Sequence, residues 1–87
     1  MASTNKIMVS VRVNGSLAEQ IGTTRLRLHL GAPATVQDVL GEMERVYPNS
    51  AELITIAIPF VAGRHLSEED PVSAGQEIAL LIPVAGG

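Results

Sequence analysis

Two segments near the start of the chain alternate between apolar and polar residues, and this pattern predicts two β-strands that each bury one face. The first strand is expected at residues 6–13 and the second at residues 24–30. Every second residue would face inward, namely Ile7, Val9, Val11 and Val13 in the first strand and Thr24, Leu26, Leu28 and Leu30 in the second. Between the strands, Asn14-Gly15 is a turn signal, and a short helical turn is expected at residues 16–22.

The middle of the chain has the signature of one amphipathic helix. Thr35 is a favourable N-cap residue, and Asp38 places a carboxylate in the first turn, where it interacts well with the helix dipole. Pro48-Asn49 would end the helix. The apolar residues of this segment share one helical face and are expected to pack in the core: Val36, Val39, Leu40, Met43, Val46 and Tyr47.

The last third of the chain predicts further strands. Residues 54–61 are rich in β-branched side chains and are expected to form a third strand, in which Pro59 indicates an edge position or a bulge. Residues 64–66 would form a brief extended piece, followed by a polar turn at residues 67–71. In a final strand at residues 77–82, Ile78, Leu80 and Ile82 would face away from Ala79 and Leu81.

This order of elements predicts an α+β fold, with one main helix packed on one face of a mixed sheet. The last strand is apolar on both faces, so we expect it to pair with the first strand at the centre of the sheet. The 87 residues suit one domain, residues 1–87, with a flexible tail at residues 83–87.

Composition excludes several classes of function. There is no cysteine, which excludes disulfides and cysteine-based metal clusters, and His29 and His65 lack the spacing of metal ligands. The net charge of −3 argues against nucleic-acid binding, and no apolar run approaches the length of a membrane span. A soluble cytoplasmic protein is expected. No nucleophile–base pair, phosphate-binding loop or paired carboxylates appear, so we expect no independent active site.

The end of the sequence carries a more specific pattern. Ala62-Gly63-Arg64-His65-Leu66 is followed by Asp70-Pro71-Val72, then by Ala74-Gly75-Gln76-Glu77-Ile78, and finally by Leu80-Leu81-Ile82-Pro83-Val84-Ala85-Gly86-Gly87. This series resembles the small subunit of molybdopterin synthase and related ubiquitin-like sulfur carriers, which form a β-grasp family. Leu80 and Leu81 stand where that motif has two aromatic residues, and Ile82 stands where it has a proline.

The resemblance implies a β-grasp fold and makes Gly87 the working group. In such carriers an E1-like adenylating enzyme uses ATP to activate the terminal carboxylate, and a sulfur donor converts it to a thiocarboxylate. The resemblance also implies that the sulfur goes to a pterin precursor in molybdopterin (molybdenum cofactor) biosynthesis. The chain would then be the small subunit of molybdopterin synthase, bound to a large synthase subunit, with no permanently bound cofactor.

Gly86, Ala85 and Val84 would form the tail that brings Gly87 into the active site of a partner, with Pro83 stiffening its base. Leu81, Pro83 and Val84 are expected to form an apolar partner-binding patch, with Arg64 and His65 at its rim. Arg25, Arg27 and His29 would be the polar face of a strand, with contact to an acidic partner as the alternative.

Three alternatives to the molybdopterin pathway stay open. The chain would serve as a sulfur carrier for thiamine or cysteine biosynthesis, or as a ubiquitin-like protein modifier whose activated carboxylate is attacked by a lysine. The third alternative, from a different class, is a non-catalytic β-grasp interaction module.

Overall fold

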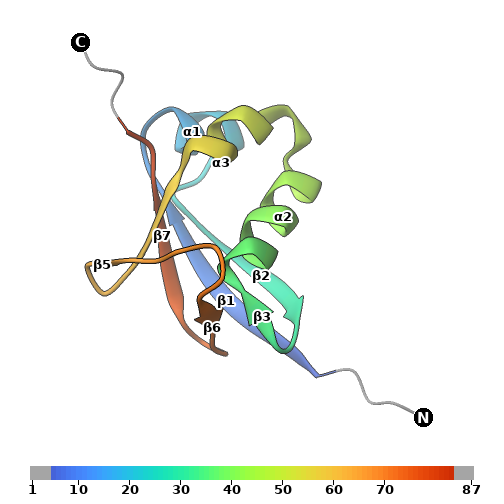
Figure 1. Cartoon of the computed structure of the whole chain (residues 1–87). Helices are drawn as coiled ribbons and strands as arrows, with labels where there is room; N and C mark the ends of the chain where they lie inside the picture. The colour runs from blue at the N-terminus through green and yellow to red at the C-terminus, as the bar shows by residue number, and fades with distance from the viewer. Residues whose placement is uncertain (1–4, 84–87) are drawn as a thin grey trace.

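The computed structural model describes residues 5–83, which form a mixed five-stranded sheet with helices on one face (Figure 1). The order across the sheet is β2-β1-β7-β4-β5. The strands are β1 (Lys6–Val13), β2 (Arg25–Gly31), β4 (Ile58–Val61), β5 (Arg64–His65) and β7 (Glu77–Leu81). The α+β class with a mixed sheet, expected from the sequence, is confirmed.

The first and last strands pair at the centre of the sheet, as expected. β1 runs parallel to β7, with Ser10 opposite Glu77 and Val13 opposite Leu80. On its other side β1 pairs antiparallel with β2, with Lys6 opposite Gly31 and Arg12 opposite Arg25. This register places Val9, Val11, Leu28, Leu30, Ile78 and Leu80 on the buried face. Thr24, expected to face inward, instead precedes β2 and is exposed.

The main helix, α2 (Val36–Val46), starts as predicted at the Thr35 cap. The main-chain N–H of Asp38 donates to Thr35 Oγ1 at 3.4 Å, and Asp38 Oδ2 accepts from the Thr35 N–H at 2.8 Å. This reciprocal pair is a capping box. Val36, Val39 and Met43 are fully buried, whereas Val46, which was expected in the core, is 42% exposed.

A small second sheet holds the start of α2, and the sequence pattern did not predict it. It pairs β3 (Ala34–Thr35) antiparallel with β6 (Pro71–Val72). Beside it, the N–H groups of Val36 and Gln37 donate to the carbonyls of Asp70 and Glu68, both at 2.9 Å. An α-helix leaves the N–H groups of its first turn without partners inside the helix. In α2, carbonyls of the polar turn before β6 accept hydrogen bonds from two of these groups.

The predicted strand at residues 54–61 is wrong in its first half. Residues there form helix α3 (Ala51–Ile56), which follows the 3₁₀ turn η1 (Pro48–Ser50), and only β4 is extended. Ile54 is fully buried on the inner face of α3, next to α2 and to the short helix α1 (Gly15–Ile21). Burial of this side chain outweighs the strand preference of the β-branched run, because propensity is weak beside tertiary packing.

Pro59 does not lie on an edge strand or at a bulge, contrary to expectation. β4 lies between β7 and β5, and its pairing with β7 is continuous through Pro59. The Pro59 carbonyl accepts from the Leu66 N–H at 2.9 Å. The backbone nitrogen of Pro59, which has no hydrogen to donate, therefore faces β5 and not β7. β5 pairs only with Phe60 and Val61, so the ladder between β4 and β7 loses no hydrogen bond.

Leu80 and Leu81 offer a matched test of the predicted register. Leu80 has no exposed surface, whereas Leu81 on the opposite face is 41% exposed. We expect Leu80→Ala to lower the free energy of unfolding by about 2–5 kcal/mol, because it leaves a cavity in the core. Leu81→Ala should change it by only about 0.5 kcal/mol. Urea denaturation of both variants measures the difference, and equal losses would contradict the register.

Candidate functional site

The predicted carrier residue Gly87 and the tail residues Val84, Ala85 and Gly86 lie outside the described residues. The structure does place the segment that leads to them. β7 runs toward the end of the sheet at which α1 and α3 lie, and it continues into Ile82 and Pro83 there (Figure 1).

A single side chain ties this strand end to the rest of the molecule. The main-chain N–H of Ile82 donates to Asn14 Oδ1 at 3.0 Å. Pro83 has no N–H to donate, so this is the last main-chain N–H bond of the described residues. Asn14 occupies the N-cap position of α1, yet its side chain makes no capping bond to that helix. The residue type that usually caps a helix is here used to fix the base of the tail.

Sequence reasoning missed this role of Asn14. The Asn14-Gly15 pair indicated only a turn, and Gly15 does have a φ of +57°, a conformation that favours glycine. The bond to Ile82 joins residues far apart in the sequence, so no local pattern could have shown it.

Beside the tail base is an open groove with mainly apolar walls. Its walls come from the start of α1, from α3 and from the end of β7, and its lining residues are Asn14, Gly15, Ser16, Leu53, Ile56, Ile82 and Pro83. Ile56 is half exposed there. Pro83, one of the predicted partner-binding residues, therefore borders this groove.

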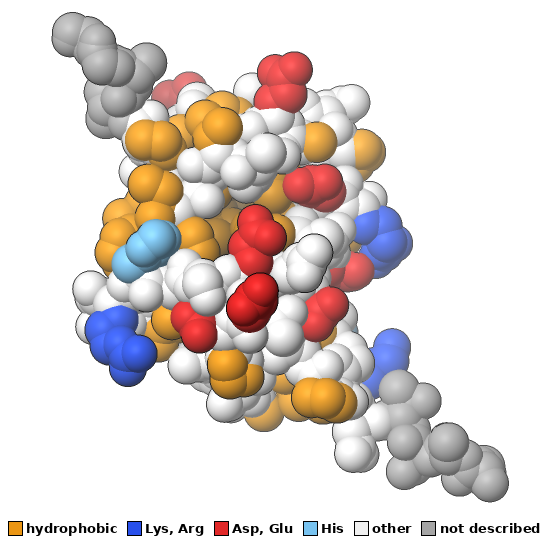
Figure 2. Space-filling view, viewed as in Figure 1, with side chains coloured by type: hydrophobic (Ala, Val, Ile, Leu, Met, Phe, Trp, Pro, Cys, Tyr) orange, Lys and Arg blue, Asp and Glu red, His pale blue; other side chains and the backbone are white. Residues whose placement is uncertain are grey.

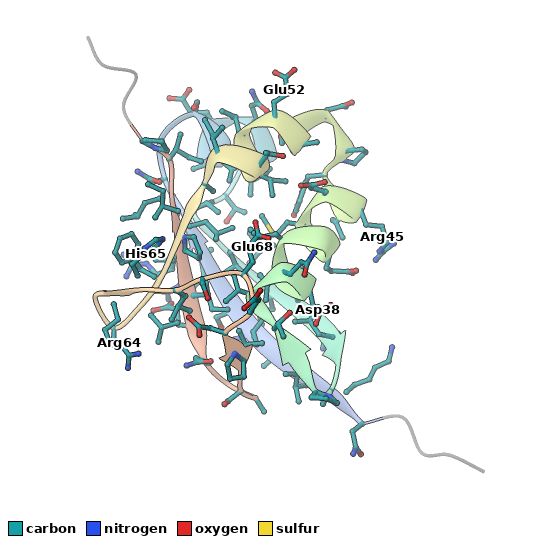
Figure 3. All side chains as sticks on the ribbon, in the orientation of Figure 1. Asp38, Arg45, Glu52, Arg64, His65 and Glu68 are labelled. Atoms are coloured by element: carbon teal, nitrogen blue, oxygen red, sulfur yellow. The ribbon has the colours of Figure 1, made fainter. Side chains whose placement is uncertain are left out.

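Leu81 belongs to a different surface, the face of the sheet that points away from the helices. Its register partner on β4 is Ile58, and Phe60 lies opposite Ala79. These four side chains form what we term the apolar patch: Ile58, Phe60, Ala79 and Leu81. The ring of His65 packs at 5.5 Å from that of Phe60, and Figures 2 and 3 show this histidine bordered by hydrophobic side chains.

Leu81 and Pro83, the two of the three predicted binding residues that the structure describes, thus contribute to neighbouring surfaces rather than to one groove; Val84 lies outside the described residues. The groove that holds Leu81 is lined by Arg12, Val13, Asn14 and Ala79, whereas Pro83 lines the α1–α3 groove. Asn14 lines both. The base of the tail is therefore flanked on two sides by surface that a partner can contact.

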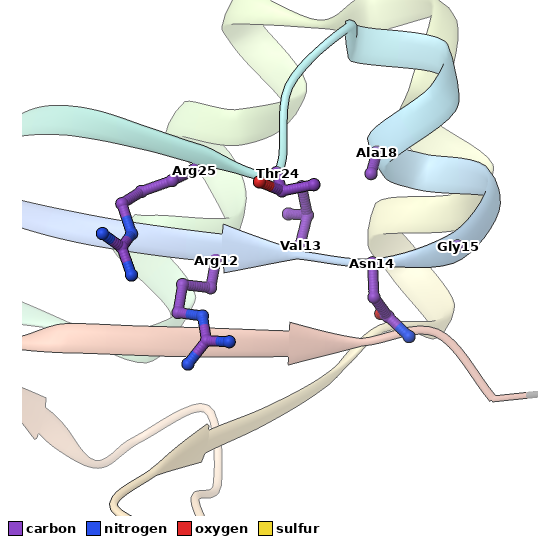
Figure 4. A pocket seen from close by; sticks show the side chains of 7 residues that line it. All are labelled: Arg12, Val13, Asn14, Gly15, Ala18, Thr24 and Arg25. Atoms are coloured by element: carbon purple, nitrogen blue, oxygen red, sulfur yellow. The ribbon is translucent and has the colours of Figure 1, made fainter.

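Charged groups adjoin the apolar patch. Arg25 Nε lies 3.2 Å from Glu77 Oε2, and Arg12 Nη1 lies 4.0 Å from Glu77 Oε1. Arg12 and Arg25 also line a hollow that extends past Thr24 and Asn14 to the start of α1 (Figure 4). Both arginine side chains are more than half exposed, so these ion pairs contribute little to stability.

Neither a cluster of metal-ligating side chains nor a membrane-spanning helix occurs in the part of the chain that the structure describes. Residues 5–83 contain no group of three or more His, Asp or Glu side chains placed to hold a metal ion. His29 and His65 lie on β2 and β5, at opposite edges of the sheet. No helix in this part of the chain has the length and apolar character needed to cross a membrane.

Elsewhere on the surface, one exposed ion pair perturbs a titratable group. Arg45 Nε and Nη2 donate to the Glu42 carboxylate at 2.9 and 2.6 Å along α2. These hydrogen bonds lower the pKa of Glu42 and raise that of Arg45. The pair lies on α2, on the helical side of the sheet, so Arg45 already has a partner within the chain.

The chain is similar to known proteins in sequence and in fold. The model of the ThiS family matches residues 11–87. No curated protein has a sequence that matches the chain. Among solved structures, SAMP1 from Haloferax volcanii is similar, with a TM-score of 0.81 and 24% identity over 92% of this chain and 99% of that one.

Two further structures share the fold. A putative molybdopterin converting factor, subunit 1, from Pyrococcus furiosus has a TM-score of 0.80 and 19% identity over 90% of this chain and 99% of that one. A ubiquitin from Caldiarchaeum subterraneum has a TM-score of 0.65 and 18% identity over 95% of this chain and 100% of that one. The ubiquitin-like β-grasp fold implied by the sequence is therefore confirmed.

The tie between Asn14 and Ile82 can be tested without any partner. We expect Asn14→Ala to lower the free energy of unfolding by about 0.5–1.5 kcal/mol, the typical net value of one hydrogen bond. Amide hydrogen exchange at Ile82 should accelerate, because its N–H loses its acceptor.

Asn14→Asp is the matched control, because it keeps an acceptor oxygen at the same position. It should retain slow exchange at Ile82, as followed by NMR. If Asn14→Ala left the exchange rate of Ile82 unchanged, the side chain would not be the anchor described here.

Proposed function

The chain belongs to the ThiS family of ubiquitin-like sulfur carriers, and from this premise we propose that Gly87 carries sulfur as a terminal thiocarboxylate. The proposal rests on the family match, which extends to the end of the sequence and includes Gly86 and Gly87. The anchored base at Ile82 supports it, because a reactive end is best presented to another enzyme from a fixed point.

The chemistry we propose needs partners at every step. A carboxylate is a poor electrophile, so an E1-like adenylating enzyme would let a Gly87 oxygen attack the α-phosphorus of ATP, with pyrophosphate leaving. A hydrosulfide ion supplied by the donor would then add to the acyl carbon, AMP would leave with its bonding electrons, and the S–H proton would be lost to water. The resulting thiocarboxylate is a soft nucleophile that attacks a substrate held by another protein.

The chain itself would supply a tail long enough to reach the active site of a partner and narrow enough to enter it. The four residues after Pro83 span at most about 13–14 Å when extended, so the reaction centre of a partner must lie within that distance of the docked domain. Glycine at positions 86 and 87 lacks a Cβ that would crowd a narrow channel or the carbonyl where the adenylate forms.

For the pathway, we propose molybdopterin biosynthesis, with this chain as the small synthase subunit and a pterin precursor as the sulfur acceptor. The Pro-Val-Ala-Gly-Gly ending supports this choice. The similar Pyrococcus furiosus protein, named a putative molybdopterin converting factor, is consistent with it. SAMP1, the small archaeal modifier protein among the similar structures, supports protein modification as the second candidate function.

The central prediction concerns the mass of the intact chain. Incubation with an adenylating enzyme, ATP and a sulfide source should raise the mass by the difference between one sulfur and one oxygen atom. Deletion of Gly87 should abolish this change and leave the circular dichroism spectrum unaltered. An unchanged mass beside an active enzyme would overturn the carrier function, whereas a lysine-linked adduct would favour the modifier.

A second prediction concerns the apolar patch. Leu81→Ala should weaken binding to a large synthase subunit by about 1–2 kcal/mol, because an apolar side chain buried at an interface contributes on this scale. Val46→Ala is the matched control, since Val46 is equally exposed, at 42%, on the helical side of the molecule. Calorimetric titration measures both variants, and equal losses of affinity would exclude the patch as the docking surface.

A further inference from the structure

The cations of this acidic chain are concentrated on one face. The chain has six Lys and Arg residues and nine Asp and Glu residues. Strand alternation places Arg12, Arg25 and Arg27, half of the six cations, on the outer face of β1 and β2, and we term these three the basic strip. The pKa of the Glu42 carboxyl on α2, lowered by the hydrogen bond from Arg45, is lowered further by Lys6, which lies at the other end of β1. Glu77 is the one carboxylate on this face of the sheet. The other eight lie on the helices and on the turn that meets α2, and Figure 2 shows acidic side chains gathered there.

The charge of the basic strip is only partly balanced within the molecule. Arg12 and Arg25 share Glu77, while Arg27 takes part in no ion pair among residues 5–83. Arg12 and Arg25 also lie directly opposite each other across the β1–β2 ladder. Like charges in this position repel each other, and the single carboxylate of Glu77 offsets only part of the two positive charges.

The basic strip is continuous with the apolar patch. Arg12 lines the same groove as Ala79 and Leu81. An apolar centre bordered by charged groups is the usual anatomy of a protein interface. The two features together therefore form one surface that extends over both halves of the sheet.

We propose that the basic strip docks against an acidic surface of the protein that receives the tail. This inference rests on the function proposed above, and it assigns the chemistry of the partner: carboxylates that face β1 and β2 beside an apolar site that takes Leu81. Carboxylates of the partner would pair with Arg27 and relieve the repulsion between Arg12 and Arg25. Guanidinium groups suit this role because they bind carboxylates in bidentate fashion.

The charge distribution favours a protein partner over nucleic acid. A phosphate backbone would be repelled by the net charge of −3 and by the carboxylates on the helical side. The apolar patch also provides a single aromatic ring, Phe60, which is too little for stacking on successive bases. A second copy of the chain fits poorly, because joining a basic face to an acidic face is heterologous and would not close into a dimer.

The same distribution would orient the encounter. An acidic partner is attracted by the basic strip and repelled by the helical side, so the productive orientation is favoured before contact. Complementary charge of this kind typically raises association rates by a factor of about 10 or more at low salt. Because the strip adjoins the tail base through Arg12 and Asn14, this orientation also directs the tail toward the partner.

The experiment is an NMR titration of the full chain with an oligoglutamate peptide as the probe. Shift changes should be confined to amides of β1, β2 and β7 at low salt. They should vanish near 1 M salt, where the Debye length is about 3 Å. Arg27→Gln should weaken binding about threefold, since it removes one of the three charges of the basic strip. Arg45→Gln, the matched control on α2, should leave binding nearly unchanged.

Three outcomes would overturn the proposal. They are a peptide response that is spread over the whole chain, equal effects of the two substitutions, and tighter binding of an oligothymidylate than of the peptide. Concentration-dependent shifts of the strip without any probe would assign it to self-association instead. The titration is independent of sulfur chemistry, so a failure here, with thiocarboxylate still formed on Gly87, would reject the basic strip and leave the carrier function standing.

Discussion

The parallel pairing of β1 with β7 is the contact on which the rest of this structure depends. It joins the start of the described chain to its end, and the helices α2 and α3, between β2 and β4, cross over one face of the sheet to make it possible. Parallel neighbours are usually covered on both faces. Here the helices cover only one, so on the opposite face Leu81 is exposed and its apolar neighbours are only half-buried. The docking surface is therefore a direct result of how the chain closes its sheet.

The same pairing brings Asn14 to the end of β7. Asn14 follows β1 and Ile82 follows β7, and because these strands are parallel both residues emerge at the same end of the sheet. Two residues before Asn14, on β1, Arg12 joins the groove of Leu81 to the basic strip. The anchor of the tail, the apolar patch and the charged border thus adjoin one another through residues 12–14. In a domain this small, a few positions serve folding and recognition together.

Much of this fold could be predicted from the sequence, because its longest elements have strong periodicity. β1, β2, α2 and β7 each show a clear repeat, and the Thr35–Asp38 cap was apparent from residue types alone. Helix α3 could not be predicted in this way, since its β-branched run favours a strand and only the burial of Ile54 decides otherwise. The two-residue strands β3 and β6 are too short to show any period. For the site, Gly87 followed from a family motif and the exposure of Leu81 from alternation, whereas Asn14 needed a contact between distant residues.

The parallel pair also determines how the domain would respond to force. A partner that draws the tail inward pulls on β7 from its end at Leu81, while the body of the domain is held through the neighbouring strands. The load then acts along the strands, so the hydrogen bonds between β1 and β7 must be sheared together instead of opening one after another. Asn14 adds a further bond at the point where the load enters. Such an arrangement would let the domain keep its shape under a pull on its C-terminal end.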